Sequence, residues 1–488
     1  MNSTVFERLA APPATVDRSL AGTRQAVFWL DDAPGTRHSQ LRGVVNADLA
    51  VVGAGYCGLW TAIKAKQREP DARVVVLEAN TVGSAASGRN GGFVEASLTH
   101  GEDNGASRWP NEIDRLNEMG LENLDQIERQ IADLGLDCDF ERNGAIDLAV
   151  EPYQETALRA MHLGPDDEFL DGPALRAQVD SPTYRAGVWH RRSSALVHPG
   201  KLAAELARVA LELGVQIFER SKVDRLDTSS PTGVELLTRA GSVRSASVAL
   251  ATNVFPSLLK RTRLHTVPVY DYVLMTEPLD AGQLDSIGWR GRQGLGDGAN
   301  QFHYYRLSRD NRILFGGYDA ITHYGQRIDP AYENRPESFA KLSSHFFTTF
   351  PQLEGLRFSH KWAGPIDTST RFCAFFGTAR AGRIAYATGF TGLGVASTHF
   401  AADVMLDLLD GIPTERTELE MVRRKPLPFP PEPLATIGVH LTKRSLDAAD
   451  HNGGRRNLFL RALDSAGLGF DSERVKRARW RSARRRKA

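Results

Sequence analysis

The chain has 488 residues, which is too long for one ordinary domain and predicts two or three. Its composition, 41% hydrophobic and 24% charged, is typical of a water-soluble globular protein. The sequence has no apolar run of about 18 residues that would span a membrane. Its first residues also lack the continuous apolar segment of a secretory signal. We therefore expect neither a membrane span nor secretion.

The net charge is +1, but nine Lys or Arg residues and two acidic residues lie in 471–488. Residues 472–488 form a basic tail, for which a solvated terminus is the preferred interpretation over a nucleic-acid contact. The cysteines Cys57, Cys138 and Cys373 are far apart and form no metal-ligand cluster. This pattern fits a reducing cytoplasm and predicts no bound metal.

Residues 1–46 are predicted to be an arm that lies across the first domain, and residues 47–92 carry the strongest motif. There a short apolar strand leads through a glycine-rich turn into a helix, and a second strand ends at Glu78. The glycines of the turn have GxGxxG spacing and are Gly53, Gly55 and Gly58. Glycine permits close approach of a pyrophosphate, the helix N-terminus favours phosphate, and the acid suits a ribose diol. A dinucleotide cofactor is predicted.

Two further glycine-rich turns distinguish FAD from NAD. The turn at 83–92 begins five residues after Glu78, too soon for another crossover helix, so its bare backbone can lie against a flat ligand. Arg89 in this turn supplies charge for a phosphate. The turn at 389–395 opens a helix whose N-terminal dipole favours the negative charge of a reduced isoalloxazine ring. The three turns together favour FAD.

The other segments alternate between two domains. Residues 111–130 and 199–213 have helical spacing of apolar residues, and 264–322 alternate like an antiparallel sheet. The predicted fold class is α/β, with a discontinuous Rossmann-like FAD-binding domain and an α+β substrate domain built on a mainly antiparallel sheet. The predicted boundaries are 47–110, 190–262 and 360–411 for the FAD-binding domain, 111–189 and 263–359 for the substrate domain, and 412–471 for a C-terminal helical cap.

Several motifs resemble one family and follow its order. They are GAGYCGLWTA with Glu78, GSAASGRNGG, ALVHPGKLAAELARVA, VALATN, PVYDYVLMTEPL, RILFGGYD, WAGPID and ATGFTGLGV. Over roughly residues 28 to 412 the chain resembles the D-amino-acid oxidase-like FAD-dependent oxidoreductases, most closely the γ-glutamylputrescine oxidoreductase type.

The resemblance implies FAD and two-electron oxidation of a C–N bond, in which hydride passes to the flavin and the imine hydrolyses. It implies that Val223 lies on the adenine side. The full set of residues that it implies for FAD is Gly53, Gly55, Gly58, Glu78, Ser87, Gly88, Arg89, Asn90, Gly91, Gly92, Val223, Gly389, Phe390, Thr391, Gly392, Leu393, Gly394 and Val395.

Departures from the family pattern bear on the substrate, the electron acceptor and the flavin linkage. Amino-acid oxidases of the family carry a substrate-binding arginine in a Gly-x-Arg-Pro stretch, and the matching stretch 363–367 has none. An amine, or an amino acid with its carboxylate elsewhere, is therefore favoured, and Asp367 either attracts an ammonium group or caps a turn. Leu314 stands where monomeric sarcosine oxidases carry a lysine, which leaves oxygen or another compound as the electron acceptor. Cys373 is not placed like their flavin-linking cysteine, so we expect non-covalent FAD.

Candidate substrate residues lie in the expected antiparallel sheet and are Tyr270, Tyr272, Tyr305 and Arg306. Tyr270 and Tyr272 share a face and either wall an amine site or pack in the core. Alternation places Tyr304 and Arg306 on the face opposite to Tyr305, so one of the two faces at most can point at the flavin.

The leading hypothesis is an FAD-dependent oxidase or dehydrogenase of a primary or secondary amine, with an ω-amino or polyamine-type substrate. The alternative is an N-methyl or cyclic amino-acid oxidase or dehydrogenase that uses Arg306 as its carboxylate partner. A further alternative is an FAD-binding interaction protein without catalysis. The expected partners are the small-molecule amine and the electron acceptor.

Overall fold

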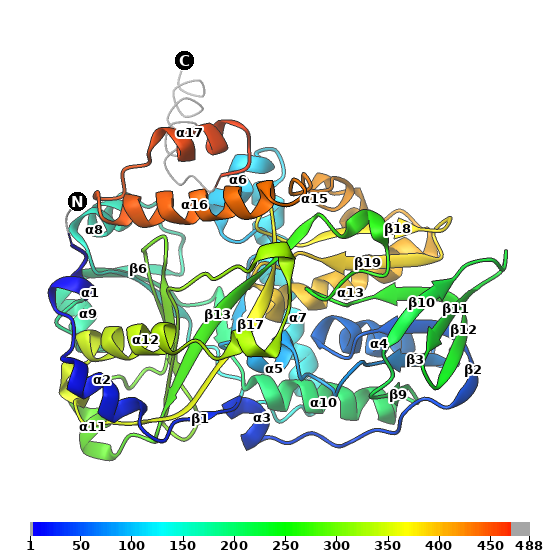
Figure 1. Cartoon of the computed structure of the whole chain (residues 1–488), viewed down its shortest axis with the longest axis horizontal. Helices are drawn as coiled ribbons and strands as arrows, with labels where there is room; N and C mark the ends of the chain where they lie inside the picture. Colours follow the sequence, from blue (N-terminus) through cyan, green and yellow to red (C-terminus); the bar gives the residue numbers. More distant parts are fainter. Residues whose placement is uncertain (1–2, 470–488) are drawn as a thin grey trace.

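The computed structural model describes residues 3–469. Two sheets form two halves, which lie side by side in Figure 1. The basic tail expected at 472–488 lies outside the described residues.

The eight-stranded sheet has a parallel core. Its strands are β2 (Gly43–Val52), β3 (Val74–Leu77), β9 (Gln216–Phe218), β10 (Val223–Asp227), β11 (Val234–Thr238), β12 (Gly241–Leu250), β18 (Phe375–Ala379) and β19 (Ile384–Thr388). Strands β9, β3, β2, β12 and β19 run parallel in this spatial order, and β10, β11 and β18 join the sheet through antiparallel pairs. The apolar run of β3 is buried on both faces, as expected of a parallel sheet. The parallel strands bring their carboxyl ends to one edge.

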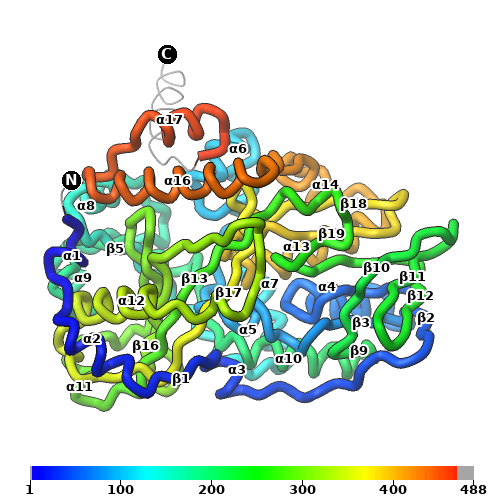
Figure 2. The backbone as a smooth tube through the Cα atoms, in the orientation of Figure 1, coloured from blue at the N-terminus to red at the C-terminus, as the bar shows by residue number. Residues whose placement is uncertain are grey.

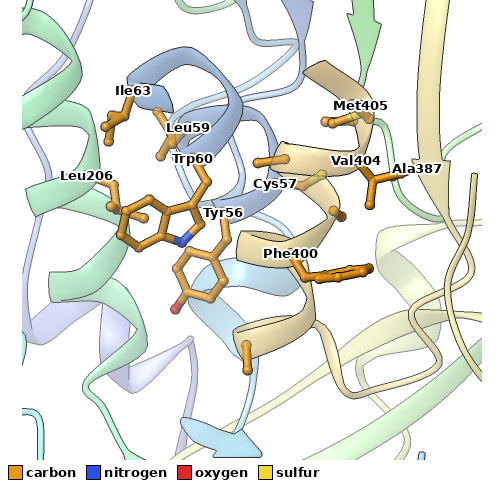
Figure 3. Packing of buried hydrophobic residues seen from close by; sticks show 14 of the residues in the cluster. Tyr56, Cys57, Leu59, Trp60, Ile63, Leu206, Ala387, Phe400, Val404 and Met405 are labelled. Atoms are coloured by element: carbon orange, nitrogen blue, oxygen red, sulfur yellow. The ribbon is translucent and has the colours of Figure 1, made fainter. Parts of the chain in front are cut away.

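Three long helices pack on this sheet: α4 (Tyr56–Arg68), α10 (Pro199–Glu212) and α13 (Gly394–Asp410). Helix α4 contacts both of the others, and its Leu59 and Ile63 are fully buried. Figure 3 shows these side chains meeting between the helices, with Leu206 of α10 next to Trp60. Each fully buried Leu or Ile contributes about 1.5–3 kcal/mol. This core fixes the helix that begins at the first glycine-rich turn.

The nine-stranded sheet is mainly antiparallel. In spatial order its strands are β1 (Arg24–Gln25), β17 (Phe358–Ser369), β13 (Thr266–Thr276), β16 (Ile313–Gly317), β15 (His303–Leu307), β14 (Gly294–Asp297), β5 (Ala145–Ala149), β7 (Ala186–His190) and β6 (Asp167–Asp171). Strand β1 pairs in parallel with β17 and β14 with β5, and the other pairs are antiparallel. Helix α12 (Pro336–Thr349) covers one face, where Phe339 and Phe346 pack against Tyr272 and Phe315.

Short elements connect and flank the two halves. The helices are α1 (Val5–Arg8), α2 (Pro13–Leu20), α3 (Phe28–Asp32), α5 (Ala86–Arg89), α6 (Glu102–Arg108), α7 (Ile113–Asp133), α8 (Pro152–Arg159), α9 (Gly172–Gln178), α11 (Ala281–Ile287), α14 (Glu415–Glu418), α15 (Glu420–Arg423), α16 (Leu434–Asp450) and α17 (Leu458–Ser465). Strands β4 (Phe93–Glu95) and β8 (Ser194–Leu196) form a separate antiparallel pair. Within residues 3–469, no helix combines the length and apolar character needed to cross a bilayer.

The N-terminal arm lies along both halves, and the sequence led us to expect it across the first domain. Helix α2 packs against α12, and β1 adds a strand beside β17. Further along the arm, His38 N donates to the Glu219 carboxylate and Leu41 N to the Ser221 hydroxyl. Figure 2 shows this blue segment running along the lower edge from α1 to β2. Backbone pairing across the halves, which has no sequence signature, explains the difference.

Two elements cross the domain boundaries expected from the sequence. Strand β17 belongs to the nine-stranded sheet, so residues 360–369 pair with the strands assigned to the other domain. Helix α7, within 111–189, packs Leu116, Leu124 and Ile127 into the core around α4 and α13. Its apolar stripe is visible in the sequence, but the partner of that stripe is decided by the three-dimensional fold.

The C-terminal helices lie over the nine-stranded half, with α16 above α12 and α17 above α16 in Figure 1. At the end of α16, the Asp450 carboxylate accepts hydrogen bonds from the side chains of Tyr153 and Asn300. The next residue, His451, bonds Glu7 of α1. These polar contacts anchor the end of α16 to α1, to α8 and to the β14–β15 loop.

Candidate active site

The first glycine-rich turn joins β2 to α4 at the carboxyl edge of the parallel strands. Gly53 has a φ of +108°, and a Cβ there would lie 2.5 Å from the carbonyl oxygen of Ala251. A Cβ at Gly58 would overlap the carbonyl oxygen of Gly53. Both positions therefore require glycine. Helix α4 begins at Tyr56 without a side chain at its N-cap, and its Tyr56 N–H is taken by Ser87, so the N–H groups that follow in the first turn of the helix are the ones offered to phosphate oxygens.

Glu78 follows β3 at the same edge. Its two carboxylate oxygens accept hydrogen bonds from Ala54 N and Asn80 N, each 2.8 Å long. Burial raises the pKa of this carboxyl, and the two bonds oppose the increase. Ser221 N donates to the carbonyl of Glu78, which brings the buried Val223 close to it. This arrangement suits the ribose and adenine end of a dinucleotide.

The second glycine-rich turn lies directly against the first. Tyr56 N donates to Ser87 Oγ over 2.9 Å, and a Cβ at Gly55 would lie 2.8 Å from that oxygen. The Asn90 amide donates to Ser87 O at 2.8 Å and accepts from Gly92 N at 2.8 Å, so it holds the turn from inside. One hydroxyl and one amide thus set the spacing of the two turns.

Two buried tryptophans hold the end of the second turn from outside. Trp29 Nε1 donates to Asn90 O at 3.0 Å, and Trp362 Nε1 donates to Arg89 O at 2.8 Å. Both indoles belong to a cluster with Leu314 and Met275 on the nine-stranded sheet. The sequence alone assigns no role to Trp29, which lies in the N-terminal arm.

Arg89 points from the second turn to the nine-stranded sheet. Its guanidinium donates to Ser84 O and Ala363 O at 2.9 and 3.0 Å, and it forms a 2.6 Å ion pair with Glu333. Its stem crosses Gly364, where a Cβ would lie 3.5 Å from Arg89 Cδ. The side chain therefore ties the two halves together, a different position from the phosphate contact suggested by the sequence.

The third glycine-rich turn is organised by Asp367. This carboxylate is buried and accepts hydrogen bonds from Gly389 N at 2.5 Å and from Thr388 Oγ1 at 3.2 Å. Burial raises its pKa to about 6, and the bonds to the turn lower it. Of the two roles weighed from the sequence, the structure shows the turn cap. The turn contains Phe390, Thr391, Gly392 and Leu393. Helix α13 begins directly after it, at Gly394, and Val395 is its second residue.

These residues fit an FAD molecule. Two of the turns follow β2 and β19, the parallel neighbours of β12, and the second turn packs against the first, so bare backbone gathers at one edge. Burial raises the pKa of Cys57 in the first turn, and the charge of Asp367 at the third turn adds to the increase. Asn253 Oδ1, just past β12, is buried without a hydrogen-bond partner among residues 3–469. A ligand donor would satisfy it.

The face of the nine-stranded sheet that meets the second turn carries Tyr304 and Asp271. The ring of Tyr304 lies over Gly316 of the neighbouring strand, where a Cβ would be 2.7 Å from the ring, and a Cβ at Gly91 would be equally close. Its hydroxyl donates to Asp271 Oδ2 at 2.5 Å. Burial raises the pKa of Asp271 to about 6. A carboxylate and a phenol therefore stand next to the glycine-rich turns.

The tyrosines proposed from the sequence lie on the other face, beneath α12. Tyr270 OH accepts from Asp329 N at 3.1 Å, Tyr272 OH donates to Tyr332 O at 2.7 Å, and Tyr305 OH bonds Tyr184 OH at 2.8 Å. All three proposed tyrosines are buried in the core of that half. Alternation along β13 consequently directs Asp271, between the first two, to the opposite face.

Arg306 lies on the same face as Tyr304 but is buried beside Gly92. Its guanidinium donates to Val197 O at 2.5 Å and lies 5.6 Å from the Trp29 ring centre. Within residues 3–469 it forms no salt bridge, and burial lowers its pKa to about 10. It therefore remains charged at neutral pH.

Comparison with known proteins agrees with this geometry. The model of the DAO family, described as FAD dependent oxidoreductase, matches residues 48–408. The chain belongs to the DAO family of FAD-dependent oxidoreductases. The resemblance seen in the sequence, the FAD dependence and the oxidoreductase class are thereby confirmed.

Named relatives of this DAO-family chain cover most of its length. Gamma-glutamylputrescine oxidoreductase of Escherichia coli (strain K12) is 30% identical over 380 residues, which cover 75% of this chain and 84% of the relative. A probable oxidoreductase OrdL of Haemophilus influenzae is 30% identical over 390 residues, covering 76% and 84%. Among solved structures, glycine oxidase from Geobacillus kaustophilus superposes with a TM-score of 0.64 at 19% identity, covering 76% of this chain and 96% of that one. The chain thus has the mixed α/β fold of these flavoenzymes.

Proposed function

We propose that this DAO-family enzyme oxidises the C–N bond of a primary or secondary amine of ω-amino or polyamine type. The observation that carries the proposal is the Asp271–Tyr304 pair, because a carboxylate beside the turns attracts an ammonium group and the family's substrate arginine is missing. The name of the E. coli relative, gamma-glutamylputrescine oxidoreductase, supports an amine of this kind.

In the proposed reaction, the C–H bond next to nitrogen breaks and its hydrogen leaves as hydride, while nitrogen loses a proton to solvent and forms a second bond to carbon. Water then cleaves the imine to an aldehyde or keto product and releases ammonia or an amine. FAD, when bound, supplies the two-electron acceptor. Asp271 binds the incoming ammonium and Tyr304 fixes the orientation of that carboxylate. Oxygen or another compound is the final acceptor.

We propose the following residues for FAD: Gly53, Gly55, Gly58, Glu78, Ser87, Gly88, Asn90, Gly91, Gly92, Val223, Gly389, Phe390, Thr391, Gly392, Leu393, Gly394 and Val395. Arg89 is proposed to brace the second turn. The parallel strands with α4, α10 and α13 are proposed as a discontinuous Rossmann-like FAD-binding domain, with a substrate domain on the antiparallel sheet and 412–471 as its cap.

Non-covalent FAD and a cytoplasmic location belong to the same proposal. Cys57, Cys138 and Cys373 are buried and unbridged, which suits a reducing compartment. Burial raises the pKa of all three thiols, so a thiolate that would attack the flavin is disfavoured.

Anaerobic mixing tests the proposed substrate class. The FAD-loaded enzyme is mixed with an aliphatic diamine, an N-acylated diamine, an ω-amino acid, an N-methyl amino acid and proline. We expect the aliphatic diamine and the N-acylated diamine to bleach the visible flavin absorbance. Adding oxygen or an artificial acceptor should then restore the absorbance, at different rates for the two acceptors. Bleaching by none of the amines would refute amine oxidation.

A second candidate, an N-methyl or cyclic amino-acid oxidase, rests on the buried Arg306 without an acidic partner among the described residues. If Arg306 binds a substrate carboxylate, Arg306→Gln should raise the KM for amines that carry a carboxylate more than tenfold, since a charged hydrogen bond is worth about 1.5–3 kcal/mol. The KM for amines without a carboxylate should stay unchanged. The leading proposal expects both KM values to change equally. Flavin content and melting temperature, measured on the same sample, control for loss of packing.

A further inference from the structure

A cavity of about 470 Å³ lies between α16 and the nine-stranded half, on the side away from the glycine-rich turns. Its walls come from α1, the β14–β15 loop, α12 and α16. Figure 1 shows α16 crossing above α12 at this place. The volume is in the range of small-molecule sites, about 300–1,000 Å³.

The cavity is separate from the proposed amine site. His345 lines it from α12, and His303 of β15 bonds that histidine. The next residue on β15, Tyr304, points to the opposite face and bonds Asp271. The sheet itself therefore stands between the two sites.

Each carboxylate of the cavity already has partners. Asp319 accepts hydrogen bonds from Arg335, Ser338 and Lys341, with distances of 2.7–3.0 Å. Asp447 accepts from Gln301 Nε2 at 3.1 Å, and Glu7 bonds His451 at 3.0 Å. The carboxylates of the lining are thus held by hydrogen bonds within the protein.

Three side chains of α16 have no such partners. Lys443, Arg444 and His440 line the cavity on one side of the helix, and none of their side chains forms a hydrogen bond or salt bridge with any of residues 3–469. Burial lowers the pKa of Lys443, although the attraction of Asp319 opposes the decrease. A half-buried ammonium without a partner is stabilised by an anion placed within hydrogen-bond distance.

The deeper wall carries a fixed imidazole. His345 Nδ1 lies 2.9 Å from His303 Nε2, and His303 Nδ1 lies 2.6 Å from Asp297 Oδ2. Burial, together with the neighbouring His303 and Lys341, lowers the pKa of His345 well below its ordinary value, so this ring is neutral. With Nδ1 engaged, Nε2 is the remaining polar atom of this cavity-lining side chain. It can donate to a ligand when Nδ1 accepts from His303.

We propose that this cavity is a second ligand site, for a small molecule that carries a carboxylate or phosphate group. The oxyanion binds Lys443 and Arg444 of α16, and His345 Nε2 on the opposite wall contacts the remainder of the molecule. The site depends on α16, which gives the C-terminal cap a role beyond covering the sheet.

Calorimetric titration of the FAD-loaded full chain tests the proposal. Inorganic phosphate and succinate are titrated at constant ionic strength, with chloride as the reference. We expect saturable binding of at least one oxyanion, and at least tenfold weaker binding by Lys443→Gln/Arg444→Gln. Binding of phosphate alone or succinate alone identifies the group recognised, and binding of both indicates general oxyanion recognition.

Matched variants separate this site from general charge effects. Arg239→Gln/Lys260→Gln removes the same charge from exposed residues outside the cavity lining and should bind like the wild type. Asp271→Asn, which alters the proposed amine site, should keep the oxyanion affinity, so failure of one proposal does not imply failure of the other. No saturable binding of either oxyanion, or wild-type binding by Lys443→Gln/Arg444→Gln, would overturn the inference. Arg444 is exposed, so Arg444→Gln alone provides a variant without risk to folding.

Discussion

Gly58→Ala should yield a protein that retains less than a tenth of the wild-type FAD. The added Cβ would overlap the carbonyl oxygen of Gly53 and lie 3.2 Å from Val51 Cγ1. Helix α4 must then move away from β2 or the turn must open, and either movement displaces the N–H groups offered to the phosphates. Overpacking of this kind costs about 1–3 kcal/mol. The FAD content follows from the visible-to-ultraviolet absorbance ratio, and thermal unfolding reports the stability loss.

Gly438→Ala is the matched control for this substitution. Gly438 lies inside α16, and its Cβ would meet nothing within 4 Å. The variant should keep its FAD and gain about 0.5–1 kcal/mol, because glycine is a poor helix former. If Gly58→Ala binds FAD as tightly as Gly438→Ala does, close packing of the first turn is not what positions the cofactor.

The glycine-rich turns could be predicted because their requirement is local. Gly53, Gly58 and Glu78 lie within one strand–turn–helix–strand unit, so the sequence spacing alone specifies their geometry. The cofactor and the oxidoreductase class followed from these motifs and from their order, and the antiparallel sheet followed from the alternation in residues 264–322.

The substrate face could not be predicted, because it depends on pairing between distant strands. Alternation separates Tyr304 from Tyr305 and Asp271 from its neighbouring tyrosines, but it does not say which face meets the second turn. The register decides this: Tyr304 pairs opposite Gly316, and only a glycine there lets the ring reach Asp271. The contact between Trp29 and Asn90 could not be predicted either, since the arm has no periodic pattern that indicates where its side chains pack.

Asp271→Asn should raise KM for amines at least tenfold while leaving the folded protein as stable as the wild type, or more so, at neutral pH. The loss in binding follows from removing the charge that attracts the ammonium group, because a hydrogen bond to a charged group is worth about 1.5–3 kcal/mol. Steady-state kinetics on the amine found by the bleaching experiment gives KM. Tyr304→Phe keeps the carboxylate and should raise KM less.

The stability half of this prediction follows from the sign of the pKa shift. The pKa of Asp271 rises from 3.8 to about 6 on folding, so its contribution is complete below pH 3.8 and is lost as the pH rises through 6. Above that range the ionised carboxylate opposes folding, by up to about 3 kcal/mol at roughly 1.4 kcal/mol per pKa unit. Asparagine has no such charge, so the free energy of unfolding of Asp271→Asn should exceed that of the wild type at pH 8 and approach it below pH 4.

A purely structural carboxylate would give the opposite result, lower stability at pH 8 with KM unchanged. A higher KM together with equal or higher stability therefore identifies Asp271 as a group retained for binding the amine.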